Sequence, residues 1–535
     1  MTEPKGYLAI VLHAHLPYVR HPEHERFLEE RWFYETVSET YLPLIAVFRS
    51  LIREKVRFRI TFSLSPTLLS MMADPLLQDR CLEYLDRLIE LAEKEKVRTK
   101  NDGSLFSLAS MYHERFKEAR RIFYTDYRQN LIEAFRELGK SGSVEFMTCA
   151  ATHGYLPLLA LQPEAVRAQI RVAVETHERF LGAKPSGIWL PECGYYPGVD
   201  PILKEEGLRY FIVDTHGILY GTPRPKYGTF MPVRCPSGVT VFGRDAETSK
   251  SVWSAEEGYP GDFDYREFYR DIGFDLDIEY LKSYLNGDGS RVNTGIKYYR
   301  ITGKTDHKEL YVPEAANRKV LEHAGNFMFN RERQIDYVQG LIGRAPLIVA
   351  PYDAELFGHW WFEGPRWIEH LFRKIQSEQS VFRTLTPSEY LAHRDVLQTA
   401  TPCASSWGYN GYSEVWLNDS NDWVYRDLHQ AAERMVDCAN RHARAQGILK
   451  RALNQMAREL LLAQSSDWAF MMKTGAHSAY AVKRTRDHLE RFTRIWSRVV
   501  KKSIDTPYLE SIESMDNIFP DIDYRVYASH PIEEA

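Results

Sequence analysis

Short apolar runs recur along the chain, and segments with a helical repeat of apolar positions separate several of them. Residues 164–181, for example, place Val166, Ile170 and Val174 four residues apart and are followed by Gly182, a typical helix stop. Strands alternating with helices predict an α/β fold with a parallel sheet, closed or open as a barrel. The uneven gaps argue against a regular eightfold barrel. The seven predicted strands cover residues 7–12, 58–62, 144–149, 187–190, 210–213, 239–242 and 347–350.

Two stretches depart from this alternation. Residues 75–139 carry two long helical patterns, so we expect a helical insertion over the rim of a barrel formed by residues 1–74 and 140–398. Residues 401–412 are rich in turn formers, and amphipathic patterns follow them. We therefore expect a helical C-terminal domain over residues 399–535, with helices at 427–446, 448–462 and 476–500.

Composition narrows the classes of protein. Apolar residues make up 44% and charged residues 26%, as in ordinary soluble proteins. The net charge of −5 offers nothing that attracts a polyanion, so nucleic acid is not an expected partner. The sequence shows neither a signal peptide nor an apolar run of membrane-spanning length, and its six cysteines are scattered. We expect a reduced cytoplasmic protein without a membrane partner.

Two carboxylates stand just beyond apolar runs, among aromatic residues. Glu192 lies in GIWLPECGYY (187–196) and Asp353 in LIVAPYDAELFGHWW (347–361). Each segment predicts a buried parallel strand that ends abruptly in polar residues. The carboxyl ends of strands are where a β/α barrel presents catalytic residues. Paired carboxylates beside aromatic stacking surfaces are typical of chemistry on a sugar.

Other titratable residues follow apolar runs in the same way. A single histidine or aspartate at a strand end is more often a capping residue than a catalyst. The joint pattern, however, predicts one polar cluster on one face of a barrel. The residues are His13, His15, His153, Asp214 and Arg244, beside Glu192 and Asp353.

Three interpretations of the carboxylates remain open at this stage. In a glycosidase they would lie roughly 5–5.5 Å apart for a retaining mechanism and farther apart for an inverting one. Alternatively, Glu192 and Asp353 are structural ion-pair partners of Arg244 or a similar base. In the third interpretation, His13, His15 and Asp353 hold a divalent metal for sugar deacetylation, although no third ligand stands at a recognisable spacing.

Tryptophan positions suggest where a sugar could stack. Trp407 and Trp416 lie in the irregular junction after residue 399, where no helical stripe requires them. They could line a cleft between the barrel and the C-terminal domain. Trp360 follows Asp353 closely and is a further candidate for substrate binding.

Five segments in order resemble the motifs of glycoside hydrolase family 57, and within it the glucan-branching and AmyC-like α-amylase subgroup. The likeness covers essentially the whole length, and the order of five motifs makes it specific. The segments are HAHLP (13–17), TCAATHG (148–154), WLPEC (189–193), PYDAELFGHW (351–360) and AQSSDW (463–468).

The resemblance implies a distorted (β/α)7 barrel with a helical insertion and an all-helical C-terminal domain that contributes to the cleft. It implies a retaining mechanism without metal or cofactor, with Glu192 as nucleophile and Asp353 as general acid/base, acting on an α-glucan. It also implies that His13, His15, His153 and Asp467 hold the donor sugar and that Trp253, Trp407 and Trp416 stack on it. From the residues alone, Asp467 is also predicted to cap a helix starting at Trp468.

The acceptor decides the product of such an enzyme. Transfer to a 6-hydroxyl gives an α-1,6 branch, whereas transfer to water gives hydrolysis. Branching relatives carry a mobile loop with a tyrosine beside the cleft, and Tyr227 in residues 216–237 is the matching candidate. Branching is the predicted function. Because this segment is shorter than in well-formed branching members, α-1,4 hydrolysis is the alternative, and a non-catalytic glucan binder is a third. The oligomeric state is left open by the sequence.

Overall fold

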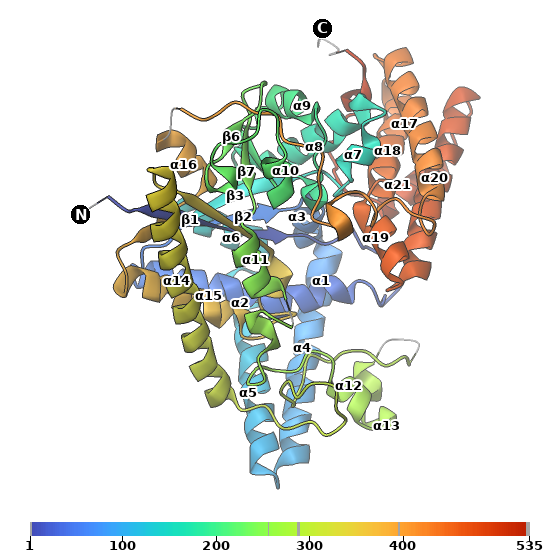
Figure 1. Ribbon diagram of the computed structural model, residues 1–535. Coiled ribbons are helices and arrows are strands. Elements are labelled where there is room, and N and C mark those ends of the chain that lie inside the picture. Colours follow the sequence, from blue (N-terminus) through green and yellow to red (C-terminus); the bar gives the residue numbers. More distant parts are fainter. Residues whose placement is uncertain (1–2, 255, 286–288, 394–395, 531–535) are drawn as a thin grey trace.

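The computed structural model describes residues 3–254, 256–285, 289–393 and 396–530. Among them, seven parallel strands form a curled sheet in the order β7-β5-β4-β3-β2-β1-β8 (Figure 1). Every predicted strand is present, and the predicted α/β barrel-like fold is confirmed. The strands are β1 (Gly6–Ala14), β2 (Ile60–Leu64), β3 (Val144–Cys149), β4 (Gly187–Trp189), β5 (Tyr210–Val213), β7 (Thr240–Gly243) and β8 (Leu347–Asp353).

The barrel is distorted where β7 and β8 approach each other. The Asp245 amide donates to the Val349 carbonyl at 2.9 Å, but no ladder joins the two strands in the described structure. The two-residue strand β6 (Val233–Arg234) pairs antiparallel with β7, and β9 (Phe382–Thr384) pairs with the start of β1. The strands are unevenly spaced in the sequence because helical segments of different lengths are inserted between them.

Helices pack around the sheet because their apolar stripes face it. The predicted helix at 164–181 is α8 (Pro163–Leu181), and Gly182 ends it with φ 79°. The others of this layer are α1 (Arg31–Thr36), the π-helical turn η1 (Val37–Tyr41), α2 (Leu42–Arg53), α3 (Pro66–Ala73), α6 (Leu131–Lys140), α7 (Leu156–Leu159), α9 (Val199–Glu205), α10 (Thr215–Leu219), α11 (Ala246–Trp253), α14 (Pro313–Ile342), α15 (Gly364–Ser377) and α16 (Pro387–His393).

A helical hairpin projects from the barrel, formed by α4 (Pro75–Thr99) and α5 (Gly103–Arg120), after which η2 (Arg121–Asp126) forms a second π-helical turn (Figure 1). It packs against a second excursion between α11 and α14, which holds the short helices α12 (Ile272–Asp275) and α13 (Ile278–Leu281). Tyr298 donates to Glu95 at 2.8 Å and Tyr112 to the Lys297 carbonyl at 2.7 Å. The sequence interpretation had included this second excursion in the barrel.

The C-terminal region is helical, as predicted, and lies beside the barrel (Figure 1). A connecting segment, residues 399–416, runs along the barrel to the C-terminal region. It forms β-bridges with three barrel residues, Thr222, Arg234 and Tyr195. The helices are α17 (Trp423–Arg441), α18 (Gly447–Ala463), α19 (Ser466–Thr474), α20 (Ser478–Val500) and α21 (Thr506–Met515).

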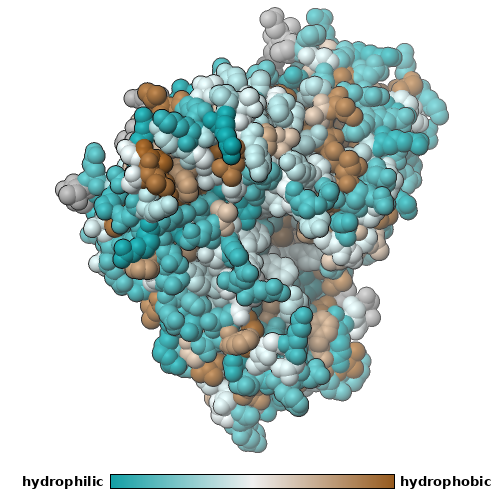
Figure 2. Space-filling model, in the orientation of Figure 1, coloured by the Kyte–Doolittle hydropathy of each residue, from teal (hydrophilic) through white to brown (hydrophobic). Residues whose placement is uncertain are grey.

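None of the helices in the described structure has the length and apolar content needed to cross a membrane. Hydrophilic residues cover most of the face seen in Figure 2, and hydrophobic residues are gathered only in small groups.

Candidate active site

Glu192 lies directly after β4 in an unusual backbone conformation. Its φ of 62° and ψ of 22° are in the left-handed region, and Cys193 follows with φ 51°. Non-glycine residues persist there only where surrounding contacts fix them, often at functional sites. Here the connecting segment supplies such contacts, since the Trp407 amide donates to the Glu192 carbonyl at 3.0 Å.

The Glu192 carboxylate receives two hydrogen bonds from outside the barrel. Ser466 donates to Oε1 at 2.9 Å, and the indole Nε1 of Trp407 donates to Oε2 at 2.8 Å. Burial raises the pKa of Glu192 to about 7, and both donors oppose that rise because they favour the ionised form. The side chain is thus poised to ionise near neutral pH.

A chain of hydrogen bonds leads from the sheet to Glu192. Ser63 meets His13 Nδ1 at 3.1 Å, His13 Nε2 meets His153 Nε2 at 3.0 Å, and His153 Nδ1 meets Ser466 Oγ at 2.8 Å. Because Ser466 gives its only proton to Glu192, a neutral His153 donates from Nδ1 and accepts at Nε2, and a neutral His13 then donates from Nε2 and accepts from Ser63, whose contact with the Thr148 carbonyl is a longer 3.4 Å. Burial, together with the neighbouring imidazoles, lowers the pKa of His13 and of His153, which fits two neutral rings.

This chain changes the role expected for two histidines. His13 and His153 are each 3% exposed, and both nitrogens of each ring already have protein partners. The predicted part in holding the donor sugar is therefore not supported for them. Their geometry serves Ser466, and through it Glu192.

Asp353 is the last residue of β8 and pairs in register with His13. Its surroundings differ from those of Glu192. Burial raises its pKa well above the ordinary value, and the nearby Glu355 and Glu192 carboxylates raise it further. In the described structure no hydrogen-bond donor reaches its carboxylate. Glu355, by contrast, accepts from the Tyr41 hydroxyl and from the His15 amide. Asp353 is thus favoured in the protonated form.

His15 and Asp467 form a second polar pair across the barrel and α19. His15 Nε2 lies 3.0 Å from Asp467 Oδ2. Burial alone would raise the pKa of Asp467, but His15 lowers it to about 2. The predicted helix cap was wrong in detail, because Ser465 is the N-cap residue of α19 and Asp467 lies in its first turn.

Asp214 and Arg244 pair with each other at 3.0 Å, and Arg244 also donates to Ser249 at 2.6 Å. Within the described structure Arg244 forms no ion pair with Glu192 or Asp353, so the part of the structural ion-pair interpretation that named Arg244 is wrong. A neighbouring base, His153, lies with its Nδ1 3.7 Å from Glu192 Oε1. The Arg244 guanidinium lies 5.7 Å from the ring centroid of Trp407, beside the site.

The tryptophans divide into three environments. Trp407 is half-buried and meets Trp189 and Trp253 edge to face, with ring centroids 5.0 and 5.7 Å away. Trp360 is 53% exposed and stacks on Phe268 at 4.3 Å. Trp416 is 1% exposed and stacks on Tyr155 at 4.5 Å, so it is a core residue and the prediction that it lines a cleft was wrong.

Tyr227 is not placed with the carboxylates. Its ring lies against Lys226 and Arg344, with the Arg344 guanidinium 5.5 Å from the ring centroid. Arg344 precedes the amino end of β8, whereas Asp353 ends that strand. The strand β8 has seven residues, and a strand of that length spans about 20 Å. The catalytic role predicted for Tyr227 therefore has no geometric support.

The metal interpretation required His13, His15 and Asp353 together. In the part of the chain that the structure describes, the ligand groups around this site are His13 with Cys149 and His153, and His15 with His153 and Asp467. Asp353 belongs to neither group. The ligand set proposed from the sequence is thus not assembled.

Several residues at the site were not singled out from the sequence. Ser466 and Glu355 lie inside two of the quoted motifs, and that position was the available signal for them. Ser63 lies on β2 opposite His13, so strand pairing would have been needed to find it. Tyr41 lies in the π-helical turn η1, and no pattern in the sequence marks it.

The arrangement places two buried carboxyl groups in different electrostatic surroundings. The Glu192 charge raises the pKa of Asp353, whereas two hydrogen-bond donors favour the ionised form of Glu192. An ionised carboxylate and a carboxylic acid on either side of a glycosidic bond can attack and protonate an acetal. The geometry supports cleavage of a glycosidic bond.

Comparison with known proteins agrees with this chemistry. The sequence profile of Glycosyl hydrolase family 57 matches residues 9–401, and that of the 1,4-alpha-glucan branching enzyme C-terminal region matches residues 427–527. The 1,4-alpha-glucan branching enzyme TK1436 of Thermococcus kodakarensis is 35% identical over 98% of this chain and 79% of its own length.

Two solved structures are similar over nearly their whole length. The alpha-amylase AmyC from Thermotoga maritima has a TM-score of 0.92 and 44% identity, covering 98% of this chain and 100% of that one. The GH57-type branching enzyme from Pyrococcus horikoshii has a TM-score of 0.88 and 34% identity, covering 99% and 98%. The chain belongs to glycosyl hydrolase family 57.

Proposed function

We propose that the protein is a retaining α-glucan-active enzyme and that its main reaction is 1,4-alpha-glucan branching. Asp353 protonates the oxygen of an α-1,4 bond while Glu192 attacks the anomeric carbon, which gives a covalent glycosyl-enzyme. Asp353, now ionised, removes the proton from a 6-hydroxyl of another chain, and that oxygen displaces Glu192 to form an α-1,6 branch.

The observation that carries the assignment of Glu192 as nucleophile and Asp353 as general acid is the contrast between the carboxylates. Glu192 has two donors that favour its anion, whereas Asp353 has carboxylate neighbours that favour its acid. A nucleophile must be ionised and a general acid protonated at the start of the reaction. His15, Asp467, Trp253, Trp407 and Trp360 are the residues we assign to glucan binding.

Branching is supported by the C-terminal region. The profile named for branching enzymes covers residues 427–527, which include Ser466 and Asp467 at the site. The full-length similarity to two branching enzymes supports the same conclusion.

Hydrolysis of α-1,4 bonds is the second candidate, and two observations favour it. The alpha-amylase AmyC is 44% identical, more than the branching enzyme structure at 34%. The Tyr227 ring also lies against Arg344 rather than beside the carboxylates. With no acceptor chain held at the site, water would complete the reaction.

Incubation with amylose separates these functions. Proton NMR of the product counts α-1,6 linkages, and a reducing-end assay counts hydrolysis. New α-1,6 linkages without a matching rise in reducing ends support branching, and rising reducing ends alone support an amylase. If neither changes, the protein is a glucan binder. The same incubation in EDTA tests the metal-dependent interpretation, which predicts loss of activity.

A further inference from the structure

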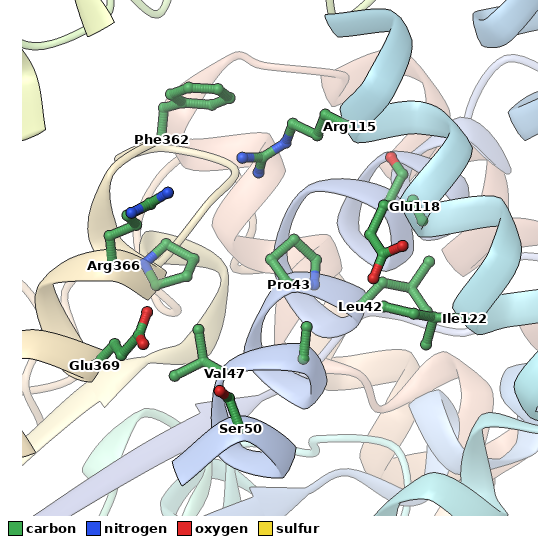
Figure 3. Close-up of a pocket in the computed structure, with 14 residues that line it drawn as sticks. Leu42, Pro43, Val47, Ser50, Arg115, Glu118, Ile122, Phe362, Arg366 and Glu369 are labelled. Carbon is green, nitrogen blue, oxygen red and sulfur yellow. The ribbon is translucent and has the colours of Figure 1, made fainter. Parts of the chain in front are cut away.

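A cavity lies between α2, α5 and α15 (Figure 3). Its volume is about 470 Å³, which is within the range of small-molecule sites. None of its lining residues belongs to the candidate active site. Its walls are mainly aliphatic and are supplied by Leu42, Pro43, Ala46, Val47, Ala119 and Ile122.

One end of this cavity is positively charged. Figure 3 shows Arg115 and Arg366 extending toward each other beside Phe362. Neither guanidinium has an acidic partner within ion-pair distance in the described structure. Arg115 donates only to the Glu39 carbonyl, at a long 3.4 Å.

Each of the two acidic residues of the lining is paired with an arginine outside the cavity. Glu118 accepts two hydrogen bonds of 2.8 Å from Arg121, and Glu369 accepts from Arg373 at 2.8 and 3.1 Å. Neither Arg121 nor Arg373 lines the cavity. In the described structure, Arg115 and Arg366 are therefore the charged side chains of the lining that have no ion-pair partner.

A third guanidinium adds to the positive potential. The Phe362 ring lies between Arg115 and Arg266, each 4.2 Å from its centroid. Burial and the charge of Arg266 together lower the pKa of Arg115, so its cation is held in unfavourable surroundings. An anion beside Arg115 would relieve that cost.

We propose that this cavity binds a small organic anion whose apolar body lies against α2 and α5 and whose acidic group lies between Arg115 and Arg366. The lining does not suit a sugar. The faces of its one aromatic ring, Phe362, are covered by guanidinium groups, and the two hydroxyl groups of the lining, those of Ser38 and Ser50, already donate to Glu35 and Glu54. The site is therefore distinct in chemistry from the glucan site.

Fluorescence titration of the full-length enzyme tests the proposal. The anionic probe is anilinonaphthalene sulfonate, and phenylnaphthylamine supplies a similar apolar body without the charge. Arg366→Glu reverses an exposed charge at the cavity mouth and should weaken the anionic probe about tenfold while leaving the neutral probe unchanged. Ala46→Phe fills the aliphatic wall and should remove binding of both probes.

Arg53→Glu is the matched control for the charge reversal. Arg53 lies on α2, as Ala46 does, but its side chain is 78% exposed and does not line the cavity. This variant should leave the binding of both probes unaffected. Amylose turnover and the thermal unfolding midpoint verify that each variant is folded. If Ala46→Phe is unstable, the binding of the two probes to Arg366→Glu is sufficient to test the proposal. The proposal is overturned if Arg366→Glu binds the anionic probe as tightly as the parent, or if maltoheptaose displaces the probe.

Discussion

The groups that contact Glu192 and those that surround Asp353 belong mainly to different parts of the chain. Glu192 is contacted by Ser466 and Trp407, which the C-terminal region and the connecting segment bring to the barrel. Asp353 has no hydrogen-bond donor at its carboxylate in the described structure, and its pKa is raised by burial, by the Glu355 and Glu192 carboxylates of the barrel and, less strongly, by Asp467 of the C-terminal region. The proposed nucleophile therefore depends on donors from outside the barrel, whereas the proposed acid depends mainly on burial and on neighbouring carboxylates. The difference assigns opposite protonation states to two residues of the same chemical type.

The largest expected effect comes from replacing the carboxylates themselves. Glu192→Gln and Asp353→Asn should each lower the turnover of amylose by at least about 10³-fold. The substrate α-maltosyl fluoride should distinguish the roles of the two carboxyl groups, because fluoride leaves without protonation by a general acid. Asp353→Asn should release a burst of fluoride and accumulate a glycosyl-enzyme visible by mass spectrometry, and Glu192→Gln should do neither. A burst from Glu192→Gln would reverse the assignment.

Removing a donor from Glu192 should have a smaller effect. Ser466→Ala removes a hydrogen bond to a charged group and should lower kcat/KM about tenfold at neutral pH. Because that bond holds the pKa of Glu192 down to about 7, its loss raises the pKa. The acidic limb of the pH profile of kcat/KM should therefore move to higher pH. Ser420→Ala, at an exposed serine, is the control, and an unmoved limb would contradict the role of Ser466.

Glu355→Gln tests the surroundings of Asp353. Its main expected effect is a shift of the pH profile of kcat/KM. The Glu355 charge raises the pKa of Asp353, so the substitution lowers that pKa. Asp353 must be protonated to act, so the alkaline limb should move to lower pH while the acidic limb stays. Tyr41→Phe should act in the same direction but less, since it removes the donor that keeps Glu355 ionised. A shift toward higher pH would exclude this account.

Tyr227→Phe should have the smallest effect. Its ring contacts Lys226 and Arg344, so loss of the hydroxyl should change the proportion of α-1,6 linkages less than about twofold. The NMR linkage measurement checks it, with Tyr220→Phe at an exposed tyrosine as the control. A change from branching to hydrolysis would show that this segment reaches the site during turnover.

Local pattern was enough to predict the sheet and to locate Glu192 and Asp353. A buried parallel strand must be a short apolar run, and its carboxyl end must be polar where it meets the cleft. Both features lie within about ten consecutive residues, so they are visible without knowing what packs against them. The same reasoning found the C-terminal helices. It missed the excursion between α11 and α14, which has little regular periodicity.

Contacts between distant parts of the chain were not predictable in this way. Trp407 and Trp416 have similar irregular surroundings in the sequence, yet one donates to Glu192 and the other is buried against Tyr155. The order of the motifs suggested that His13 and His153 share a site, but not that each occupies both ring nitrogens on protein partners.

The sequence by itself determined which strands form, which carboxylates stand at their ends and which family the motifs resemble, because each depends on neighbours along the chain. Only the tertiary structure decided which carboxylate is ionised. That outcome depends on Ser466, which is 274 residues from Glu192 in the chain, and on the packing that excludes water around both acids. Protonation is set by the donors and charges that surround a group in space, and a linear pattern does not record them.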